Sequence, residues 1–249
     1  MMKQGGAENP PGKNRPRIAV VLMASGSGKR YGKNKLLEYF GGRPLFAHAL
    51  CRAAESGADS ICVVTRYPEI REYVERWKNA GAGSSVDPGA FEESGSFVSS
   101  AEPGSIRVIW NDHPERGISQ SLRLGLDAQR EADGCCFMVC DQPMLKTETL
   151  RRMFRAFRES PDDICVCSDG RRRGNPVLFP KDLFRELMQL NGDSGGRQIM
   201  KKYPQRIREI IVERPEELYD IDSAENMEFL REHPAGSGHT DENTDRVFR

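Results

Sequence analysis

One stretch near the N-terminus constrains the fold more than any other. An apolar run, Ile18 to Met23, leads directly into the small residues Ser25-Gly26-Ser27-Gly28. The run is short, continuous and rich in β-branched residues, which predicts a buried strand. Glycines let the backbone turn tightly and bring its N–H groups close to a ligand. Because Arg30 and Lys35 then supply positive charge, the stretch is typical of a phosphate-binding loop.

Two common phosphate-binding motifs do not fit this loop. A P-loop needs a glycine and a hydroxyl residue at positions that Met23 and Arg30 occupy here. The dinucleotide fingerprint needs its third glycine one residue before Gly32, and an acidic residue after the next strand, which instead ends at Thr65-Arg66. A plain strand-to-helix turn with solvated cations is the remaining structural interpretation.

The rest of the chain alternates between patterns typical of strands and of helices. Alternation of this kind predicts βαβ units and a three-layer α/β fold with a mainly parallel sheet. The further expected strands are 60–65, 106–110, 135–140, 164–167, 175–179 and 207–212. The expected helices are 44–55, 69–78, 119–130, 147–159, 181–190, 196–202 and 223–232.

Composition separates three segments from this pattern. Residues 1–16 are polar and lack the apolar core of a signal peptide, so we expect a disordered leader. Residues 79–105 are dominated by Gly, Ser, Ala, Pro and acidic residues and predict a flexible insertion, with a functional lid as the alternative. Residues 233–249 predict a disordered tail. One domain over residues 17–232 remains.

Charge and cysteine content narrow the class of protein. The chain has 37 basic and 37 acidic residues and a net charge of zero, so no overall field favours nucleic acid or an anionic membrane. No apolar run approaches the length of a transmembrane helix. None of the seven cysteines belongs to a Cys-x-x-Cys pair with histidines at zinc spacing. We therefore expect buried thiols and a cytoplasmic protein without nucleic-acid or membrane partners.

Ligands bind at the carboxyl ends of the strands in open α/β sheets. This rule places the loop after Met23, the loop after Trp110 and Asp141 on one edge. Asp141 follows the most apolar strand and precedes Pro143, and carboxylate oxygens are the ligands that Mg²⁺ prefers. Asp141 is therefore a candidate metal ligand, with a turn or N-cap aspartate as the alternative.

Two polar segments beyond this edge carry further candidates. Ser119 and Ser121 stand at a helix start, where hydroxyls cap the helix or contact a base edge, and Gly117 leaves room for a base. In the second segment, Asp193 or Ser194 is expected to cap a helix whose N–H groups would accept an anion. A Gly-rich capped turn explains the same residues structurally.

The first loop resembles the signature Leu-Ala-Ala/Gly-Gly-x-x-x-Arg-x-Gly-x-x-Lys of nucleotidyltransferases that activate sugars, polyols and molybdopterin. Met23 and Ser25 depart from the usual Leu and Ala/Gly. Ala24, Gly26, Arg30, Gly32 and Lys35 agree with it.

Four later segments resemble the same group of enzymes. Asp141-Gln-Pro143 is similar to the metal-binding motif of the molybdenum cofactor cytidylyltransferase family, and Asp220-Ile-Asp222-Ser223 to a segment that helps hold the metal. The stretch from Asn111 to Gly125 resembles the nucleoside-recognition element. Residues 173–179 and 192–197 look like motifs of the cytidylyltransferase branch. Without the resemblance, Asp222 or Ser223 is equally a helix cap.

The resemblance implies a Rossmann-like nucleotidyltransferase that uses Mg²⁺ or Mn²⁺. Such an enzyme would transfer CMP from CTP, or the corresponding nucleotide from another NTP, to Mo-molybdopterin. Its implied catalytic residues are Arg30, Lys35 and Asp141, and its metal ligands Asp141 and Asp222. Its nucleotide-binding residues are Ala24, Ser25, Gly26, Ser27, Gly28, Asn111, Gly117, Ser119 and Ser121. Its substrate-binding residues are Asn175, Asp193, Ser194 and Arg197.

Two alternatives stay open at this point. One is a nucleotidyltransferase that uses GTP or acts on a sugar or polyol phosphate, since Met23 and Ser25 depart where relatives choose the base. The other is a carrier that delivers finished cofactor to a molybdenum hydroxylase apoenzyme. Retention of Arg30, Lys35 and Asp141 argues against a purely non-catalytic carrier.

Overall fold

Strand β1 (Ile18–Ala24) lies near the middle of a seven-stranded sheet in the order β5-β4-β1-β6-β8-β7-β9. The computed structural model describes residues 15–26, 34–79 and 106–232. Its other sheet strands are β4 (Ser60–Thr65), β5 (Ile106–Trp110), β6 (Gly134–Val139), β7 (Ile164–Ser168), β8 (Arg173–Pro180) and β9 (Ile207–Ile211).

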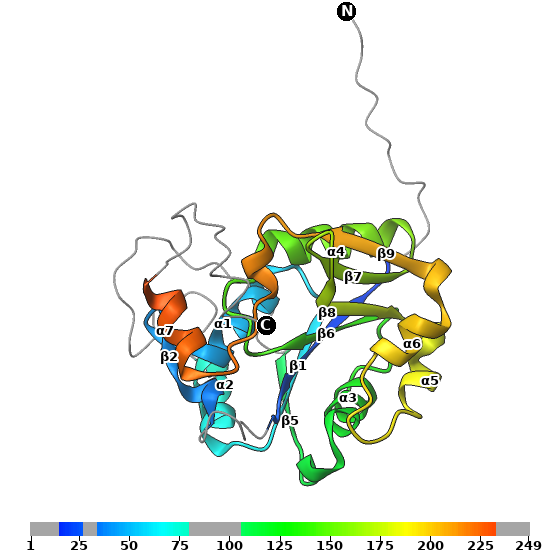
Figure 1. Cartoon of the computed structure of the whole chain (residues 1–249). Helices are drawn as coiled ribbons and strands as arrows, with labels where there is room; N and C mark the ends of the chain where they lie inside the picture. Colours follow the sequence, from blue (N-terminus) through cyan, green and yellow to red (C-terminus); the bar gives the residue numbers. More distant parts are fainter. Residues whose placement is uncertain (1–14, 27–33, 80–105, 233–249) are drawn as a thin grey trace, which may run out of the picture.

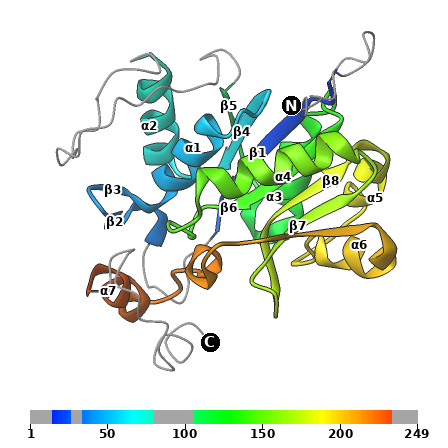
Figure 2. The ribbon, with the colours of Figure 1, turned by 90° about the horizontal axis from the view of Figure 1, so that it is seen from above.

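Helices cover both faces of the sheet, as Figures 1 and 2 show. They are α1 (Leu45–Glu55), α2 (Pro68–Asn79), α3 (Ile118–Asp127), α4 (Thr147–Glu159), α5 (Phe184–Leu187), α6 (Arg197–Lys202) and α7 (Ala224–Glu232). The helices α1, α2 and α4 pack on one face, whereas α3, α5 and α6 pack on the other. The predicted three-layer, Rossmann-like α/β architecture is confirmed.

Strand β1 is apolar along its whole length because helices cover both faces of the sheet. Val20 and Leu22 point into the core beneath α1 and α4, and Val21 points into the core beneath α3. Successive side chains of a strand alternate between faces, so a strand covered on both sides must be apolar throughout. The pairing register brings the carboxyl ends of β1, β4 and β6 to the same side of the sheet, because Ala24 pairs with Thr65 and Met23 pairs with Val139.

The sheet is mainly parallel, with one reversal. Strands β5, β4, β1 and β6 run parallel, β8 is antiparallel to both β6 and β7, and β9 is parallel to β7. The reversal brings the chain after β8 back over the face that carries α3. No helix within the described ranges combines the length and apolar character needed to cross a membrane.

Several predicted bounds differ from the structure. The helix expected at 181–190 is a 3₁₀ turn, Lys181–Leu183, followed by the short α5, because 3₁₀ geometry often opens a short helix. Helix α3 ends at Asp127, before the predicted residue 130, and β8 begins earlier, at Arg173. A hairpin of two-residue strands, β2 (Tyr39–Phe40) and β3 (Arg43–Pro44), was not predicted because such strands show no periodicity.

The expectation of buried cysteine thiols is confirmed. All seven are buried free thiols, and removal from water raises the pKa of Cys62 to about 12.

The predicted leader, insertion and tail lie outside the described residues, except that Asn79 ends α2 and residues 15–16 precede β1.

Helix α3 lies so close to β1 that Gly125 has no room for a side chain. A Cβ there would overlap with Cγ1 of Val21. We expect Gly125→Ala to destabilise the protein by about 1–3 kcal/mol, because overpacking outweighs the helix propensity that alanine adds. Urea denaturation measures the change in unfolding free energy. In a Val21→Ala background the same substitution should be neutral or stabilising, and a neutral effect in the wild type would contradict the packing argument.

Candidate active site

Three charged residues from distant parts of the chain meet at the carboxyl edge of the sheet. Nζ of Lys35 lies 2.8 Å from Oδ2 of Asp141 and 2.8 Å from Oδ1 of Asp222. Lys35 opens the 3₁₀ turn Lys35–Leu37, Asp141 follows β6, and Asp222 precedes α7. The structure therefore brings together the predicted cation and both predicted metal ligands.

Local contacts hold each of these residues in place. The side chain of Asn34 accepts a hydrogen bond from the N–H of Leu36 at 3.1 Å, which fixes the turn that carries Lys35. The N–H of Ile221 donates to the carbonyl of Asp141 at 2.9 Å, and the Ile221 side chain is buried in a small apolar cluster. The hydrogen bond ties the segment before α7 to the end of β6, and the cluster packs it against Leu45 at the start of α1.

The helix cap of α7 is Ser223, not Asp222. Oγ of Ser223 accepts a hydrogen bond from the N–H of Asn226 at 3.1 Å. Oδ1 of Asn226 in turn accepts from the N–H groups of Asp222 and Ser223, at 2.9 Å each. Because the cap is made by its neighbour, the carboxylate of Asp222 is left for Lys35 and solvent, with 54% of its side chain exposed.

The electrostatics of the site fit a divalent cation. Burial lowers the pKa of Lys35, but Asp141 and then Asp222 outweigh it, so the net shift is upward and the amine stays charged. Oδ1 of Asp141 is buried and has no hydrogen-bond partner among the described residues. An unpartnered buried carboxylate oxygen is costly, and a metal ion would satisfy it.

The number of protein ligands also fits magnesium or manganese. Within the described ranges no group of three or more His, Cys, Asp or Glu residues is placed to hold a metal. Asp141 and Asp222 are the two carboxylates that flank Nζ of Lys35. Mg²⁺ is commonly held by one or two carboxylates together with substrate phosphates and water.

Two residues beside this group were not predicted as site residues. Nε2 of Gln142 donates to Oδ1 of Asp220 at 2.8 Å and to the carbonyl of Leu218 at 3.3 Å. Gln142 thereby links the end of β6 to the segment that carries Asp222. The signal for both was present, since each lies inside a motif already singled out.

The start of the glycine-rich loop is anchored to β4. Oγ of Ser25 donates to the carbonyl of Val64 at 3.1 Å, and Oγ1 of Thr65 donates to the carbonyl of Ala24 at 3.1 Å. The hydroxyl of Tyr67, which sequence reasoning missed, donates to the carbonyl of Gly26 at 2.6 Å. The predicted residues Ser27, Gly28 and Arg30 lie outside the described residues.

The predicted nucleoside element is built into the protein interior. Asn111 is buried, and its Nδ2 donates to Oγ of Ser121 at 3.2 Å. Ser119 is also buried, and neither serine caps α3. Gly117 has φ +80° and lies so close to Gly192 and Asp193 that a Cβ would collide with them. The structure thus gives a packing reason for this glycine, and base contact by these residues stays a prediction.

A cavity of about 680 Å³ gathers three of the four predicted substrate-binding residues. Asn175, Asp193 and Arg197 line it, while Oγ of Ser194, which is not part of the lining, accepts from Nε2 of Gln198 at 2.9 Å. The expected helix cap by Asp193 or Ser194 is wrong, because α6 begins at Arg197 and its N-cap position is Gly196, without a side-chain cap. The apolar floor consists of Met23, Leu122, Phe137, Val177 and Phe179.

Two cations at this cavity are available for an anion. Arg197 and Lys201 stand one turn apart on α6 and both line the cavity. Neither side chain makes a hydrogen bond or ion pair with another described residue. Lys201 was missed from the sequence, because only the fold shows that it shares a cavity with Arg197.

Asp220 gives the site a pH-dependent effect on stability. Asp220 is exposed as a residue, but its carboxyl lies beside Gln142 and Asp141. Partial removal from water and then the charge of Asp141 raise its pKa to about 6. The folded state thus holds this proton more tightly than the unfolded chain, and stability is lost as pH rises through about 6.

We therefore expect Asp220→Asn to stabilise the protein more at about pH 7.5 than at about pH 4.5. Asn keeps the Oδ1 acceptor for Gln142 but removes the charge. Urea denaturation of both proteins in a metal chelator measures the difference in unfolding free energy. A difference that does not change with pH would contradict the assigned pKa.

Comparison with known proteins identifies one family over most of the chain. The family model of the MobA-like NTP transferase domain matches residues 20–207. The purine catabolism protein PucB of Bacillus subtilis is 25% identical over 218 residues, which cover 87% of this chain and 97% of PucB. A molybdenum cofactor guanylyltransferase of Shewanella loihica is 25% identical over 185 residues, covering 74% of this chain and 79% of that protein.

Solved structures share the fold. Rv0371c from Mycobacterium tuberculosis H37Rv superposes with a TM-score of 0.61 at 24% identity, covering 85% of this chain and 95% of that one. A nucleotidyl transferase from Methanothermobacter, Mth528, superposes with a TM-score of 0.65 at 22% identity, covering 87% and 97%. With most of the chain matched by one family, this protein belongs to the MobA-like NTP transferases and is a nucleotidyltransferase.

Proposed function

We propose that this nucleotidyltransferase transfers CMP from CTP to the phosphate of Mo-molybdopterin, giving molybdopterin cytosine dinucleotide and pyrophosphate. The observation that carries the proposal is the meeting of Lys35, Asp141 and Asp222 at the sheet edge where nucleotidyl transfer needs cations and carboxylates. The choice of CTP rests on the resemblance of residues 173–179 and 192–197 to the cytidylyltransferase branch.

Transfer of GMP from GTP is the second candidate. Relatives from several Shewanella species carry the name molybdenum cofactor guanylyltransferase. Transfer to a sugar or polyol phosphate is the remaining alternative.

In this proposal Asp141 and Asp222 hold a divalent cation, Mg²⁺ or Mn²⁺. Support comes from the unpartnered Oδ1 of Asp141 and from a structure of M. tuberculosis Rv0371c described as a complex with manganese. Such a cation neutralises charge on phosphate oxygens. Lys35 already lies between both carboxylates and adds a fixed positive charge beside them.

Nucleotidyl transfer asks the protein mainly for positioning and charge neutralisation. An oxygen of the acceptor phosphate forms a bond to the α-phosphorus of the nucleotide, and the bond from that phosphorus to the β-phosphate oxygen breaks. Because the attacking phosphate is already an anion at neutral pH, the protein needs no general base. We assign triphosphate binding to the backbone of residues 26–28 and to Arg30.

The cavity beneath α6 is the proposed acceptor site. Its apolar floor suits a flat heterocycle, and Arg197 and Lys201 suit an anionic acceptor. Asn175 adds a polar group on the β8 side. We further propose that the enzyme works in the cytoplasm, since its cysteines are unpaired thiols, and that a molybdenum hydroxylase apoenzyme receives the product.

The nucleotide is tested by pyrophosphate release with Mg²⁺ and Mo-molybdopterin, offering CTP, GTP, ATP and UTP separately. We expect release with CTP alone. Release with GTP alone would move the protein to the second candidate. Silence with all four nucleotides would point to a different acceptor or to the carrier role, and repeating the assay with Mn²⁺ separates either result from a wrong choice of metal.

Asp141→Asn should lose turnover by about 100-fold or more, because one carboxylate of the charged group is neutralised. The thermal midpoint should stay close to that of the wild type. Asp162→Asn is the matched control, since Asp162 is exposed and lies before β7, at the amino end of that strand and so opposite the carboxyl ends that carry the charged group. Equal loss of stability and activity in Asp141→Asn would instead make Asp141 a structural turn residue.

A further inference from the structure

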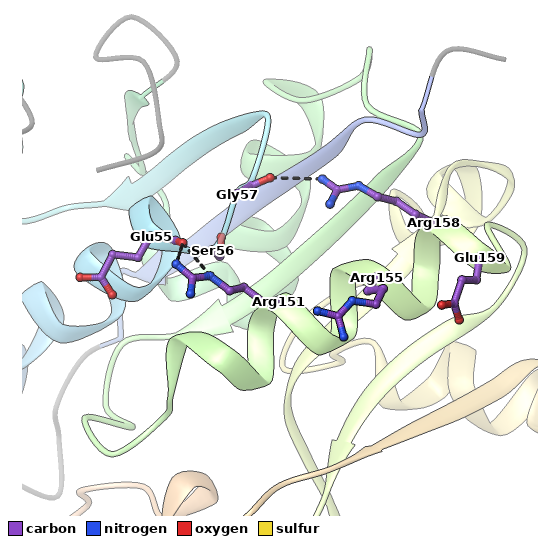
Figure 3. Close-up of a pocket in the computed structure, with 7 residues that line it drawn as sticks. All are labelled: Glu55, Ser56, Gly57, Arg151, Arg155, Arg158 and Glu159. Atoms are coloured by element: carbon purple, nitrogen blue, oxygen red, sulfur yellow. Dashed lines mark hydrogen bonds between the residues drawn. The ribbon is translucent and has the colours of Figure 1, made fainter. Parts of the chain in front are cut away.

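A second cavity lies at the opposite edge of the sheet from the active site. It has a volume of about 560 Å³ and lies between the C-terminal end of α1 and helix α4 (Figure 3). Nearby Asp59 accepts a hydrogen bond from the N–H of Ile18 at 2.8 Å, so this edge is where β1 begins. The lining residues are Glu55, Ser56, Gly57, Arg151, Arg155, Arg158 and Glu159.

Three arginines of α4 face this cavity. Residues 151, 155 and 158 are spaced four and three apart, which puts them on one side of a helix. Figure 3 shows Arg151 and Arg158 reaching the turn after α1, with Arg155 between them. We call these three side chains the arginine cluster.

Capping explains two members of the cluster but not the third. Arg151 donates to the carbonyl of Glu55 at 3.0 and 3.3 Å, and Arg158 donates to the carbonyl of Gly57 at 3.2 Å. These bonds satisfy carbonyls at the end of α1. Arg155 makes no hydrogen bond or ion pair with any described residue. Nε of Arg158 is buried and also unpartnered among them.

Carboxylates balance Arg151 and Arg158 in part, but none among the described residues pairs with Arg155. Glu148 lies 3.9 Å from Arg151. Glu159 pairs with Arg208 at 2.9 Å, outside the cluster. Glu55 accepts from Thr147 at 2.6 Å and lies 3.5 Å from Arg52. Asp59, at 3.7 Å from Arg158, is also paired with Arg15 at 2.7 Å.

The surroundings of Arg158 disfavour the charged form of its guanidinium. Removal from water and then the positive charge of Arg15 lower the pKa of this guanidinium, and Asp59 offsets them only in part. An anion beside the cluster would offset both effects. Guanidinium groups present forked N–H donors that match phosphate oxygens and bind them in pairs.

We propose that the arginine cluster binds a phosphate group, either free inorganic phosphate or the phosphomonoester of a small ligand. Arg155 and the free N–H groups of Arg158 and Arg151 provide the donors, and the turn at Ser56-Gly57 forms the opposite wall. The site shares no residue with the proposed active site and does not depend on the proposed reaction.

The test is a titration of the full-length protein with inorganic phosphate, followed by backbone amide NMR. We expect saturable shifts at Ser56, Gly57 and residues 155–158, separable from any shifts near Asp141. Arg155→Gln should weaken the binding by about tenfold, because a hydrogen bond to a charged group is lost. Arg155 is exposed, so this substitution should leave folding and basal turnover unchanged.

Arg71→Gln is the matched control, because Arg71 is also an exposed helical arginine but lies on α2, outside the cavity. It should bind phosphate as the wild type does. A parallel titration with glycerol 3-phosphate distinguishes a phosphomonoester site from one that takes only the free anion. Non-saturating shifts equal to those in sodium chloride of the same ionic strength, or equal binding by Arg155→Gln, would overturn the proposal.

Discussion

Burial of β1 on both faces is the constraint on which the rest of the structure depends. Val20 and Leu22 pack beneath one helical layer and Val21 beneath the other. Each such fully buried side chain contributes about 1.5–3 kcal/mol relative to exposure. Pairing of β1 with β4 and β6 then sets three strand ends side by side, which is why one edge of the sheet collects polar loops from distant parts of the chain.

At that edge the charged group of Lys35, Asp141 and Asp222 combines two requirements. One amine between two carboxylates leaves a net negative charge, and one oxygen of Asp141 remains unsatisfied. Such an arrangement costs stability in the free protein, and a metal ion with a triphosphate would offset that cost. Ile221, Gln142 and Ser223 hold the backbone around it, so the segment before α7 acts as a positioned part of the site.

The charged residues at the carboxyl ends of the strands, here called the carboxyl edge, differ from those at the amino ends, the opposite edge. At the carboxyl edge, carboxylates face a lysine, and the neighbouring cavity beneath α6 adds Arg197 and Lys201. At the opposite edge, the arginine cluster faces the C-terminal end of α1. Helix α1 runs between these edges, since Leu45 at its start packs against Ile221 beside the active site and Glu55 at its end contacts Arg151. Each edge therefore presents cations suited to phosphate, in separate cavities.

Local signals in the sequence were sufficient for much of the fold. Continuous apolar runs are typical of strands buried on both faces, so β1 and β6 were predicted almost to the residue. Helix α4 was predicted with its full bounds, because its apolar residues recur at helical spacing. The two-residue hairpin was missed, and the helix expected at 181–190 is in fact a 3₁₀ turn and the short α5, since elements of this length depend on tertiary contacts.

The sequence by itself determined the fold class and the chemical types at the site, because apolar periodicity and residue identity are local properties. Only the tertiary structure decided how those residues are used. In the folded chain Ser223 caps α7 and Asp222 pairs with Lys35. The hydroxyl of Ser121 accepts a hydrogen bond from Asn111. Folding also brings Lys201 to the cavity beside Arg197. Such roles depend on distances between side chains that lie far apart in the chain, which no local pattern contains.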